Sequence, residues 1–155
     1  MTQESPSGQT IRGTGVVAGL AHGVARWVRR DAELEELLAG GDAGAAATPP
    51  TDEQVEHARE RFTAAATTVA ARLEERSALA TGVSAEVLAA NAVLARDRGW
   101  AKAVVKELKK GLGVEAATVA ATETFVEMFM KIGGRQAERV TGLRDICARV
   151  VAALR

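Results

Sequence analysis

The sequence predicts an all-α fold: a helical bundle of two helical hairpins with a kinked pair of short helices, plus a short glycine-rich, strand-like N-terminal segment. Apolar residues make up 47% of the 155 residues, yet only three Phe and two Trp occur and Tyr is absent. Small apolar side chains let helices approach closely. From residue 51 onward apolar residues recur at helical spacing, interrupted by short polar or glycine-containing segments. Such short connections predict antiparallel neighbours.

The first 50 residues differ from the rest and divide into three parts. The polar composition of residues 1–10 predicts a disordered leader. Residues 11–30 are expected to be strand-like, because each of their glycines disfavours a helix by roughly 1 kcal/mol. Residues 31–50 are expected to form a connecting loop, in which the stretch DAELEELLA is compatible with a turn or two of helix. The glycines of the strand-like segment are Gly13, Gly15, Gly19 and Gly23.

A long helix is expected from residue 51 to about residue 79. Thr51 follows two prolines and precedes Gln54 by three positions, which is the spacing of a capping box. At 1.5 Å per residue such a helix is about 43 Å long. Its expected buried face, at helical spacing, consists of Val55, Ala58, Phe62, Ala65, Ala66, Val69 and Leu73.

Two short helices are expected next, separated by the polar stretch RDRG at residues 96–99. Ser84 is the expected N-cap of the first. The second is expected to stop at KKGLG, where Gly111 suits a left-handed cap and the lysines suit the negative end of the helix dipole. The apolar positions are Val87, Leu88, Val93 and Leu94 in the first helix and Trp100, Val104, Val105 and Leu108 in the second.

Two further long helices complete the expected bundle. One runs from about Val114 to Lys131 and ends at a glycine pair. The other covers Glu138 to Leu154, where Asp145 and Arg149 lie one turn apart in the favourable acid-first order. Its apolar stripe, expected to be buried, consists of Leu143, Ile146, Cys147, Val150, Val151 and Leu154.

Charge and cysteine content narrow the class of protein. Twenty basic and twenty acidic residues cancel, which disfavours a protein that binds polyanions over its whole surface. A single cysteine forms no internal disulfide and fits a reducing compartment. No apolar run reaches the length of a membrane span, and the N-terminus does not resemble a signal peptide. We expect a cytoplasmic protein with no membrane and no nucleic-acid partner.

One local basic stripe begins at the kink between the two short helices. Because no aromatic residues are interleaved with it, a solvated helix face is favoured over a nucleic-acid patch, which stays the weaker alternative. The stripe consists of Arg96, Arg98, Lys102, Lys106, Lys109 and Lys110, with Asp97 among them.

The sequence contains no recognisable catalytic or metal-binding motif. His57 has Glu53 and Arg61 one turn to either side, which favours a solvated ion-pair partner. His22 has no carboxylate or nucleophile nearby in the sequence, so a structural position is favoured there too. Metal ligation needs Cys, His or carboxylates at ligand spacing, and the sequence offers none. Neither KIGGRQ nor GTGVVAG matches a phosphate-binding or dinucleotide-binding loop. We expect no catalytic residue, no metal site and no cofactor in this chain.

Segments at the two ends of the chain carry a resemblance to a known family. The stretch GTGVVAGLAHGVARWV resembles the start of Enzyme I of the bacterial phosphotransferase system, with Ala18 where that family has proline. The stretch FVEMFMKIGGRQAERVTGLRDICARVV is similar to the family's glycine pair followed by A-E-R-x-x-D-L-R-D-I and R, with Gly142 in place of the first aspartate. Between them, VLAANAVLARDRGW is similar to the family's short-helix segment. The resemblance covers residue 11 to the end. The matching positions are Gly13, Gly19, Ala21, Gly23, Ala25, Gly133, Gly134, Ala137, Glu138, Arg139, Leu143, Arg144, Asp145, Ile146 and Arg149.

This resemblance implies a role that periodicity does not show. Enzyme I moves a phosphoryl group from phosphoenolpyruvate to its own histidine and then to the small phosphocarrier protein HPr. A helical subdomain that binds HPr is inserted in an α/β subdomain that holds the phosphohistidine. Residues 51–155 match the inserted subdomain, and residues 11–30 would belong to the α/β subdomain. The family's G-G-x-x-S-H-type motif is missing here. The chain alone is therefore expected to be inactive and monomeric, with Mg²⁺ and the phosphoenolpyruvate-binding domain expected only in the full-length enzyme.

The resemblance also implies which residues bind HPr. The family surface is typically acidic, whereas this chain has Ala89, Arg96 and Arg98 there. We therefore hypothesise docking led by an apolar patch, in which Leu94 and Trp100 receive an apolar side chain of HPr. The expected partner-binding residues are Val87, Asn91, Val93, Leu94, Arg96, Trp100, Met128 and Arg139.

A second class of function stays open: a free-standing helical adaptor that binds another protein. The sequence beyond Arg155 separates the two, because a phosphohistidine motif is expected there only for Enzyme I. In an Enzyme I the last helix would lead into the missing α/β subdomain. Its outward Arg144, Asp145 and Arg149 are then expected to face that neighbour.

Overall fold

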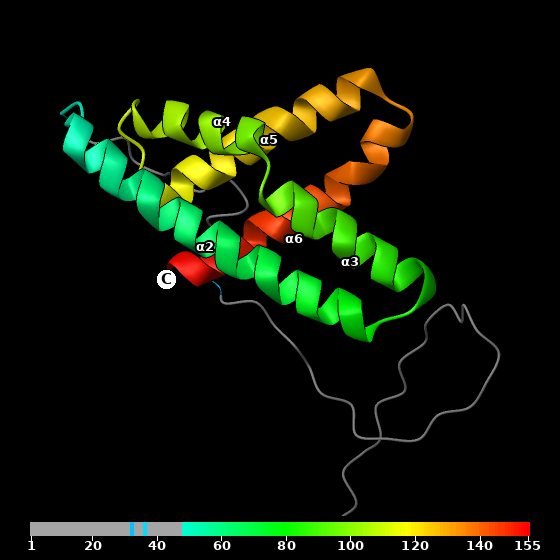
Figure 1. Ribbon diagram of the computed structural model, residues 1–155. Helices are drawn as coiled ribbons and strands as arrows, with labels where there is room; N and C mark the ends of the chain where they lie inside the picture. Colours follow the sequence, from blue (N-terminus) through cyan, green and yellow to red (C-terminus); the bar gives the residue numbers. More distant parts are fainter. Residues whose placement is uncertain (1–31, 33–35, 37–47) are drawn as a thin grey trace, which may run out of the picture.

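The structure is a computed structural model that describes residues 48–155 together with the isolated positions 32 and 36. Within 48–155 the chain forms five helices and no strand, so the predicted all-α bundle is confirmed there (Figure 1). The predicted leader at 1–10, the strand-like segment at 11–30, His22 and most of the loop at 31–50 lie outside the described residues. The helices are α2 (Asp52–Leu79), α3 (Gly82–Ala95), α4 (Arg98–Leu108), α5 (Val114–Ile132) and α6 (Arg135–Leu154).

Helix α2 is central to the bundle, because it contacts each of the other four helices. It forms one hairpin with α3, while α5 and α6 form the second hairpin and α4 packs against α5 (Figure 1). The two predicted hairpins and the kinked pair α3–α4 are therefore present. None of the described helices is long and apolar enough to cross a membrane.

The start of α2 is fixed by the predicted capping box. Thr51 Oγ1 accepts a hydrogen bond from the Gln54 backbone N–H at 3.2 Å, and Gln54 Oε1 accepts one from the Thr51 N–H at 2.8 Å. The predicted apolar face is buried, except that Ala58 is only partly buried and Ala70 joins the buried set. The buried residues of α2 are Val55, Phe62, Ala65, Ala66, Val69, Ala70 and Leu73.

The ends of the short helices agree with the prediction only in part. Ser84 is not the N-cap of α3, because the helix already begins at Gly82. Gly82 has a φ of +60°, which glycine adopts without the steric cost that a Cβ brings. Asp97, within the predicted break, caps α4 by accepting a hydrogen bond from the Trp100 N–H at 2.7 Å. Gly111 follows α4 with a φ of +93°, as the predicted left-handed stop requires.

The turn between α5 and α6 is made by two glycines. Gly133 and Gly134 have φ values of +71° and +58°, in a backbone region that residues with a Cβ rarely enter. Helix α6 begins at Arg135, three positions before the predicted start. Its predicted apolar stripe is buried throughout, namely Leu143, Ile146, Cys147, Val150, Val151 and Leu154.

Three charged side chains of α6, those of Arg144, Asp145 and Arg149, have partners inside the described bundle. Arg149 Nε lies 2.8 Å from Asp145 Oδ2, which is the predicted acid-first pair. Arg144 reaches α5, where its Nη2 lies 3.1 Å from Glu123 Oε2. A contact of these residues with a further subdomain stays a prediction.

The largest buried side chain belongs to Trp100, which is 1% exposed. Its ring meets Phe62 edge to face, with centroids 5.2 Å apart and an interplanar angle of 79°. Its Nε1–H donates to Thr122 Oγ1 at 3.1 Å, and that hydroxyl donates to the Thr118 carbonyl at 2.7 Å. One tryptophan therefore joins α2, α4 and α5.

Candidate docking site

A small pocket lies where α3, α4, α5 and α6 meet. Its volume is about 90 Å³. The end of α3, the kink and the first turn of α4 contribute to it from one part of the chain, and α5 and α6 contribute from another. The lining residues are Leu94, Asp97, Trp100, Phe125, Phe129, Arg139 and Leu143.

Most of the pocket wall is apolar. Phe125 and Phe129 lie one turn apart on α5 and meet edge to face, with ring centroids 6.1 Å apart. Leu143 is buried on α6, and Leu94 is partly buried at the end of α3. The buried Trp100 completes the wall. The pocket is therefore suited to an apolar group.

Two charged side chains share this pocket with the apolar wall. The Asp97 carboxylate is held in place because it accepts the Trp100 backbone N–H. Arg139 is exposed near the start of α6. A largely apolar site with a few fixed polar groups is the usual make-up of a specific binding site, in which the polar groups set the orientation of what binds.

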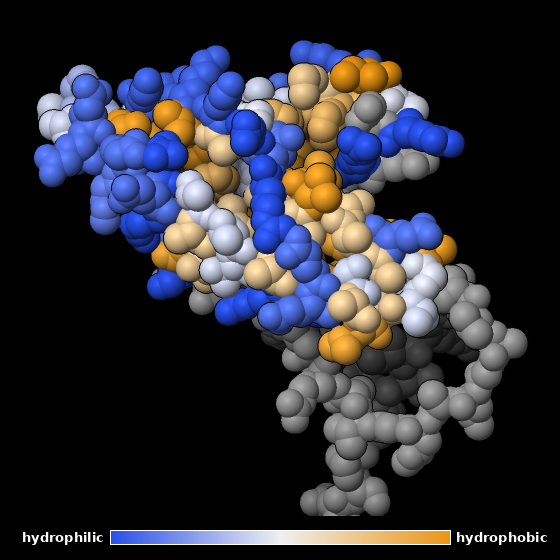
Figure 2. Space-filling view, viewed as in Figure 1, coloured by the Kyte–Doolittle hydropathy of each residue, from blue (hydrophilic) through white to orange (hydrophobic). Residues whose placement is uncertain are grey.

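Exposed apolar residues adjoin the pocket residues along the chain. Val93 precedes Leu94 and is 72% exposed, and Met128 precedes Phe129 and is 44% exposed. On the face that Figure 2 displays, apolar side chains in orange lie between polar ones in blue. Exposed apolar groups beside an apolar pocket indicate a contact surface for another molecule. We define the docking patch as Val93, Leu94, Met128, Phe129 and Arg139.

The charge near the patch is lower than the sequence indicates. Arg96 forms an ion pair with Glu74 of α2, and its Nη2 donates to Glu74 Oε2 at 3.2 Å. This hydrogen bond lowers the pKa of Glu74 and raises the pKa of Arg96. Lys110 of the same stripe lies 2.7 Å from Glu107. Two cations of the predicted basic stripe are thus already paired.

The pocket brings together three of the eight predicted partner-binding residues: Leu94, Trp100 and Arg139. Val93 and Met128 are exposed next to pocket residues, as a contact role requires. The prediction for Trp100 needs correction, because a side chain that is 1% exposed offers almost no surface to a partner. Trp100 supports the pocket from the core instead.

The other predicted residues on α3 lie outside the pocket. Val87 is 52% exposed and precedes Leu94 by about two turns. Asn91 is half-buried and lies against α6, since a Cβ built on Gly142 would be 2.7 Å from Asn91 Oδ1. Asn91 therefore helps to position α3 on α6.

Several pocket residues were missing from the sequence prediction: Asp97, Phe125, Phe129 and Leu143. The sequence does contain a signal for two of them, because Phe125 and Phe129 are spaced to share one helix face. Asp97 stands three residues before Trp100, which is the spacing of an N-cap and the amide that it caps. Their convergence on Leu94 depends on the packing of four helices, which no local pattern encodes.

Within 48–155 the single thiol is buried and the single histidine is exposed. Burial raises the pKa of Cys147 to about 11, so its thiol stays protonated and unreactive at neutral pH. His57 is exposed on α2, in agreement with the predicted solvated position. Within 48–155 no group of three or more His, Cys, Asp or Glu side chains is arranged to hold a metal ion.

Comparison with known proteins gives a family match. The family described as "PEP-utilising enzyme, N-terminal" matches residues 12–139, which include α2 to α5 and the start of α6. No curated protein matches the chain.

Proposed function

Because the chain belongs to the family of N-terminal domains of PEP-utilising enzymes, we propose that it is the part of an Enzyme I that docks the phosphocarrier protein HPr. In this proposal the helices bind and orient a protein partner and perform no chemistry themselves. The resemblance of the segment ending in LRDICARVV to Enzyme I supports the choice of HPr as the partner.

The observation that carries the proposal is the apolar pocket of about 90 Å³, with exposed Val93 and Met128 adjacent in sequence to its lining residues Leu94 and Phe129. Binding energy at protein interfaces concentrates where an apolar anchor of one partner enters a well-packed pocket of the other. The small volume suits a single apolar side chain. HPr would provide this anchor, while Arg139 and Asp97 set its orientation.

Chemistry in this proposal belongs to other parts of the full-length enzyme. A histidine outside this chain would take the phosphoryl group from phosphoenolpyruvate and pass it to the docked HPr. Mg²⁺ would serve that full-length enzyme, in the cytoplasm. The contribution of the docking patch is to hold HPr at a fixed distance and orientation from that histidine.

Chemical-shift mapping tests the proposal directly. Titration of the ¹⁵N-labelled chain with HPr from the same organism is expected to shift amide signals within residues 87–100 and at Met128 and Arg139. Shifts confined to residues 51–75 would contradict the assigned site. A folded chain whose spectrum does not respond to HPr would contradict the partner and favour the adaptor alternative.

A matched pair of valines on α3 provides the control. Val93 and Val83 have the same side chain, the same helix and similar exposure, 72% and 75%. Val93→Asp is expected to weaken HPr binding by about ten-fold or more, because it places a charge beside the apolar pocket. Val83→Asp is expected to leave the dissociation constant unchanged within about two-fold. Equal losses from both variants would exclude the docking patch.

Salt dependence distinguishes apolar-led docking from charge-led docking. Arg139 is the charged residue of the docking patch, and Arg96, which follows Leu94 by two positions, is already paired with Glu74. Raising the salt concentration from about 0.05 to 0.5 M is therefore expected to change the dissociation constant by less than about three-fold. A steep loss of affinity over this range would show that charge leads the docking.

A further inference from the structure

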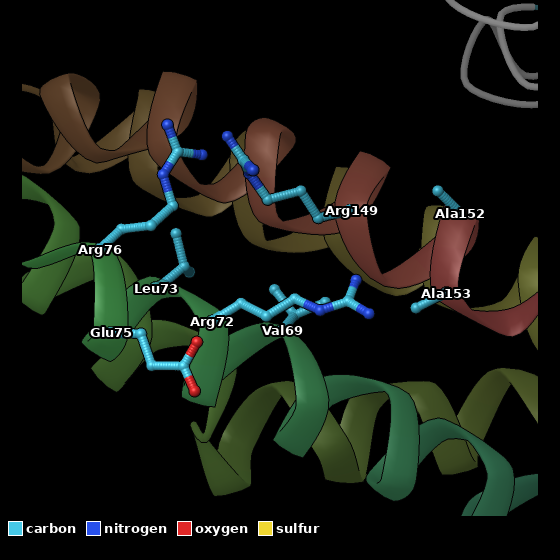
Figure 3. Close-up of a pocket in the computed structure, with 8 residues that line it drawn as sticks. All are labelled: Val69, Arg72, Leu73, Glu75, Arg76, Arg149, Ala152 and Ala153. Atoms are coloured by element: carbon cyan, nitrogen blue, oxygen red, sulfur yellow. The ribbon is translucent and has the colours of Figure 1, made fainter.

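A long furrow follows the contact between α2 and α6, and it shares no residue with the docking patch. It consists of two adjoining cavities of about 450 and 440 Å³, which have Arg72, Ala152 and Ala153 in common. Along α2 the furrow extends from Arg61 to Arg76, which is roughly 22 Å at the rise of a helix. Figure 3 shows the larger of the two cavities.

The two helices that form the furrow are antiparallel. At one end Arg61 Nη2 of α2 donates to the carbonyl of Leu154, the last residue of α6, at 3.0 Å. At the other end Arg76 of α2 and Arg149 of α6 line the same cavity. Two antiparallel helices in contact leave a groove between them in which a third helix packs. The furrow has the length of about four turns of such a helix.

The base of the furrow is apolar and consists mostly of small side chains. Val69 and Leu73 belong to it and are buried in the bundle. Ala152 and Ala153 of α6 are exposed there, as is Ala64 of α2. Small side chains at a contact shorten the distance between helix axes. The base therefore allows the close approach of a further helix.

The walls of the furrow carry an excess of positive charge. Arg72 and Arg76 belong to α2, and Arg149 belongs to α6 (Figure 3). Arg61 is the fourth arginine of the lining, and Glu75 is its acidic residue. Figure 3 shows the carboxylate of Glu75 pointing away from the guanidinium groups of Arg76 and Arg149.

The arginines of the α2 wall are available for a partner. Arg72 and Arg76 are exposed and make no hydrogen bond or ion pair with any described residue. Arg149 donates to Asp145 of its own helix at 2.8 Å. Guanidinium groups are the side chains best suited to bind carboxylates through paired hydrogen bonds. A ligand that matches the furrow therefore combines an apolar stripe with carboxylates beside it.

We propose that the α2–α6 furrow binds an acidic amphipathic helix of a protein partner. The apolar face of that helix, with residues at i, i+3, i+4 and i+7, covers the base of the furrow. Arg72 and Arg76 are one turn apart, so they meet carboxylates one turn apart on the partner. Arg149 meets a carboxylate on the other edge of the apolar face. The inference does not depend on HPr, because the furrow and the docking patch share no residue.

A designed peptide tests the furrow directly. The probe is a helix-forming peptide of about sixteen residues, capped at both ends, with leucines on one face and glutamates along both edges of that face. Titration of the ¹⁵N-labelled chain is expected to shift the amide signals of Val69, Leu73, Ala152 and Ala153, with a dissociation constant below about 1 mM. If these signals do not move, or if only the docking patch responds, the proposal is wrong.

Charge reversal tests the match between carboxylates and arginines. Arg72→Glu with Arg76→Glu is expected to weaken binding of the glutamate peptide by about ten-fold or more. The same variant is expected to bind a peptide that has lysines in place of the glutamates, which the wild type should not bind. Arg98→Glu with Lys102→Glu changes the net charge equally at exposed positions of α4 outside the furrow, so it should alter the dissociation constant by less than about two-fold. Equal losses from both variants would overturn the charge match.

Two further titrations test other occupants of the furrow. Octanoate has an apolar tail and a carboxylate but no helix, and it is expected to give no saturable shift at the peptide's concentration. Dilution of the free chain from about 1 mM to about 0.05 mM is expected to leave the furrow signals in place. Saturation by octanoate would make the furrow a site for small organic anions, and shifts on dilution would assign it to a second copy of the chain. Either result would overturn the helical partner.

Discussion

The indole of Trp100 depends on a single hydroxyl group. Its Nε1–H is buried and donates to Thr122 Oγ1 at 3.1 Å. If a buried N–H donor loses its acceptor, its desolvation free energy is no longer offset by a hydrogen bond and destabilises the folded state. The hydroxyl of Thr122 therefore matters for stability, although threonine is an ordinary residue on a helix face.

Thr122→Val is expected to lower the free energy of unfolding by about 1–3 kcal/mol, because it removes the acceptor while keeping the shape of the side chain. Urea unfolding measures the change. Thr124→Val is the matched control, since Thr124 is exposed on the same helix and bonds only to the Ala120 carbonyl. It should change stability by less than about 0.5 kcal/mol. Similar losses from both variants would show that the Trp100 contact contributes nothing.

The thiol of Cys147 gives the protein a pH dependence above neutrality. Burial raises the pKa of this thiol from 9.0 to about 11. Between these values the unfolded chain releases the thiol proton while the folded chain keeps it. The unfolded state then binds fewer protons, so the free energy of unfolding falls as pH rises from about 9 to 11.

Comparison of the wild type with Cys147→Ala isolates this contribution from that of other groups. The difference in unfolding free energy between the two proteins is expected to shrink by about 2 kcal/mol between pH 7.5 and pH 10.5. Urea titrations at both pH values measure it. A difference that stays constant with pH would mean that the thiol titrates normally in the folded state.

At the scale of the helices, the short pair α3–α4 depends on its junction. The Asp97 carboxylate accepts the Trp100 N–H at the start of α4, and the same residue lines the pocket. Asp97→Ala is expected to cost about 1 kcal/mol of stability, because an N-cap is lost. Asp97→Asn retains a capping oxygen and should cost only a few tenths of that. Urea unfolding of both variants checks this; equal losses would mean that charge, not capping, is what matters at position 97.

The crossing of α3 and α6 depends on a glycine that faces an amide. A Cβ at Gly142 would lie 2.7 Å from Asn91 Oδ1, so Asn91 must move if the glycine is replaced. Glycine inside a helix costs roughly 0.5–1 kcal/mol relative to alanine. Gly142→Ala is therefore expected to stabilise the protein by about that amount in an Asn91→Ala background, and by less in the wild type. A double-mutant cycle of urea unfolding measures the coupling, and a coupling of zero would contradict the contact.

Across the whole molecule, burial is distributed unevenly. Helix α2 buries seven residues along its length, whereas α3 buries only Ala92 and Ala95 near its end. Several large apolar residues of α3 are exposed, Val83 and Val93 among them. Helix α3 therefore buries few residues for its length, although it packs along α2.

Amide hydrogen exchange is expected to follow this distribution. The amides of the first two turns of α3 should exchange faster than those of α2 around Val69 and of α6 around Val150, because local opening of α3 exposes little buried surface. Exchange monitored by NMR at neutral pH tests this. Protection of early α3 equal to that of central α2 would show a single cooperative unit.

The local sequence accounts for where the helices lie and which faces they bury. Thr51 and Gln54 fix the start of α2, the glycine pair ends α5, and the buried stripe of α6 agrees with its apolar spacing residue by residue. Helical periodicity and capping involve residues within about four positions of one another, so both can be predicted from the sequence.

Only the tertiary structure decided what the exposed parts of those helices do. Trp100 belongs to the core because Thr122, 22 positions away, accepts its N–H, and Arg96 is paired because Glu74, also 22 positions away, faces it. The start of α3 at Gly82 rather than Ser84 follows from a left-handed glycine, not from a side-chain cap. The pocket joins residues from four helices. The packing of segments that are distant in sequence produces no periodic pattern in the sequence, whereas a buried helical stripe does.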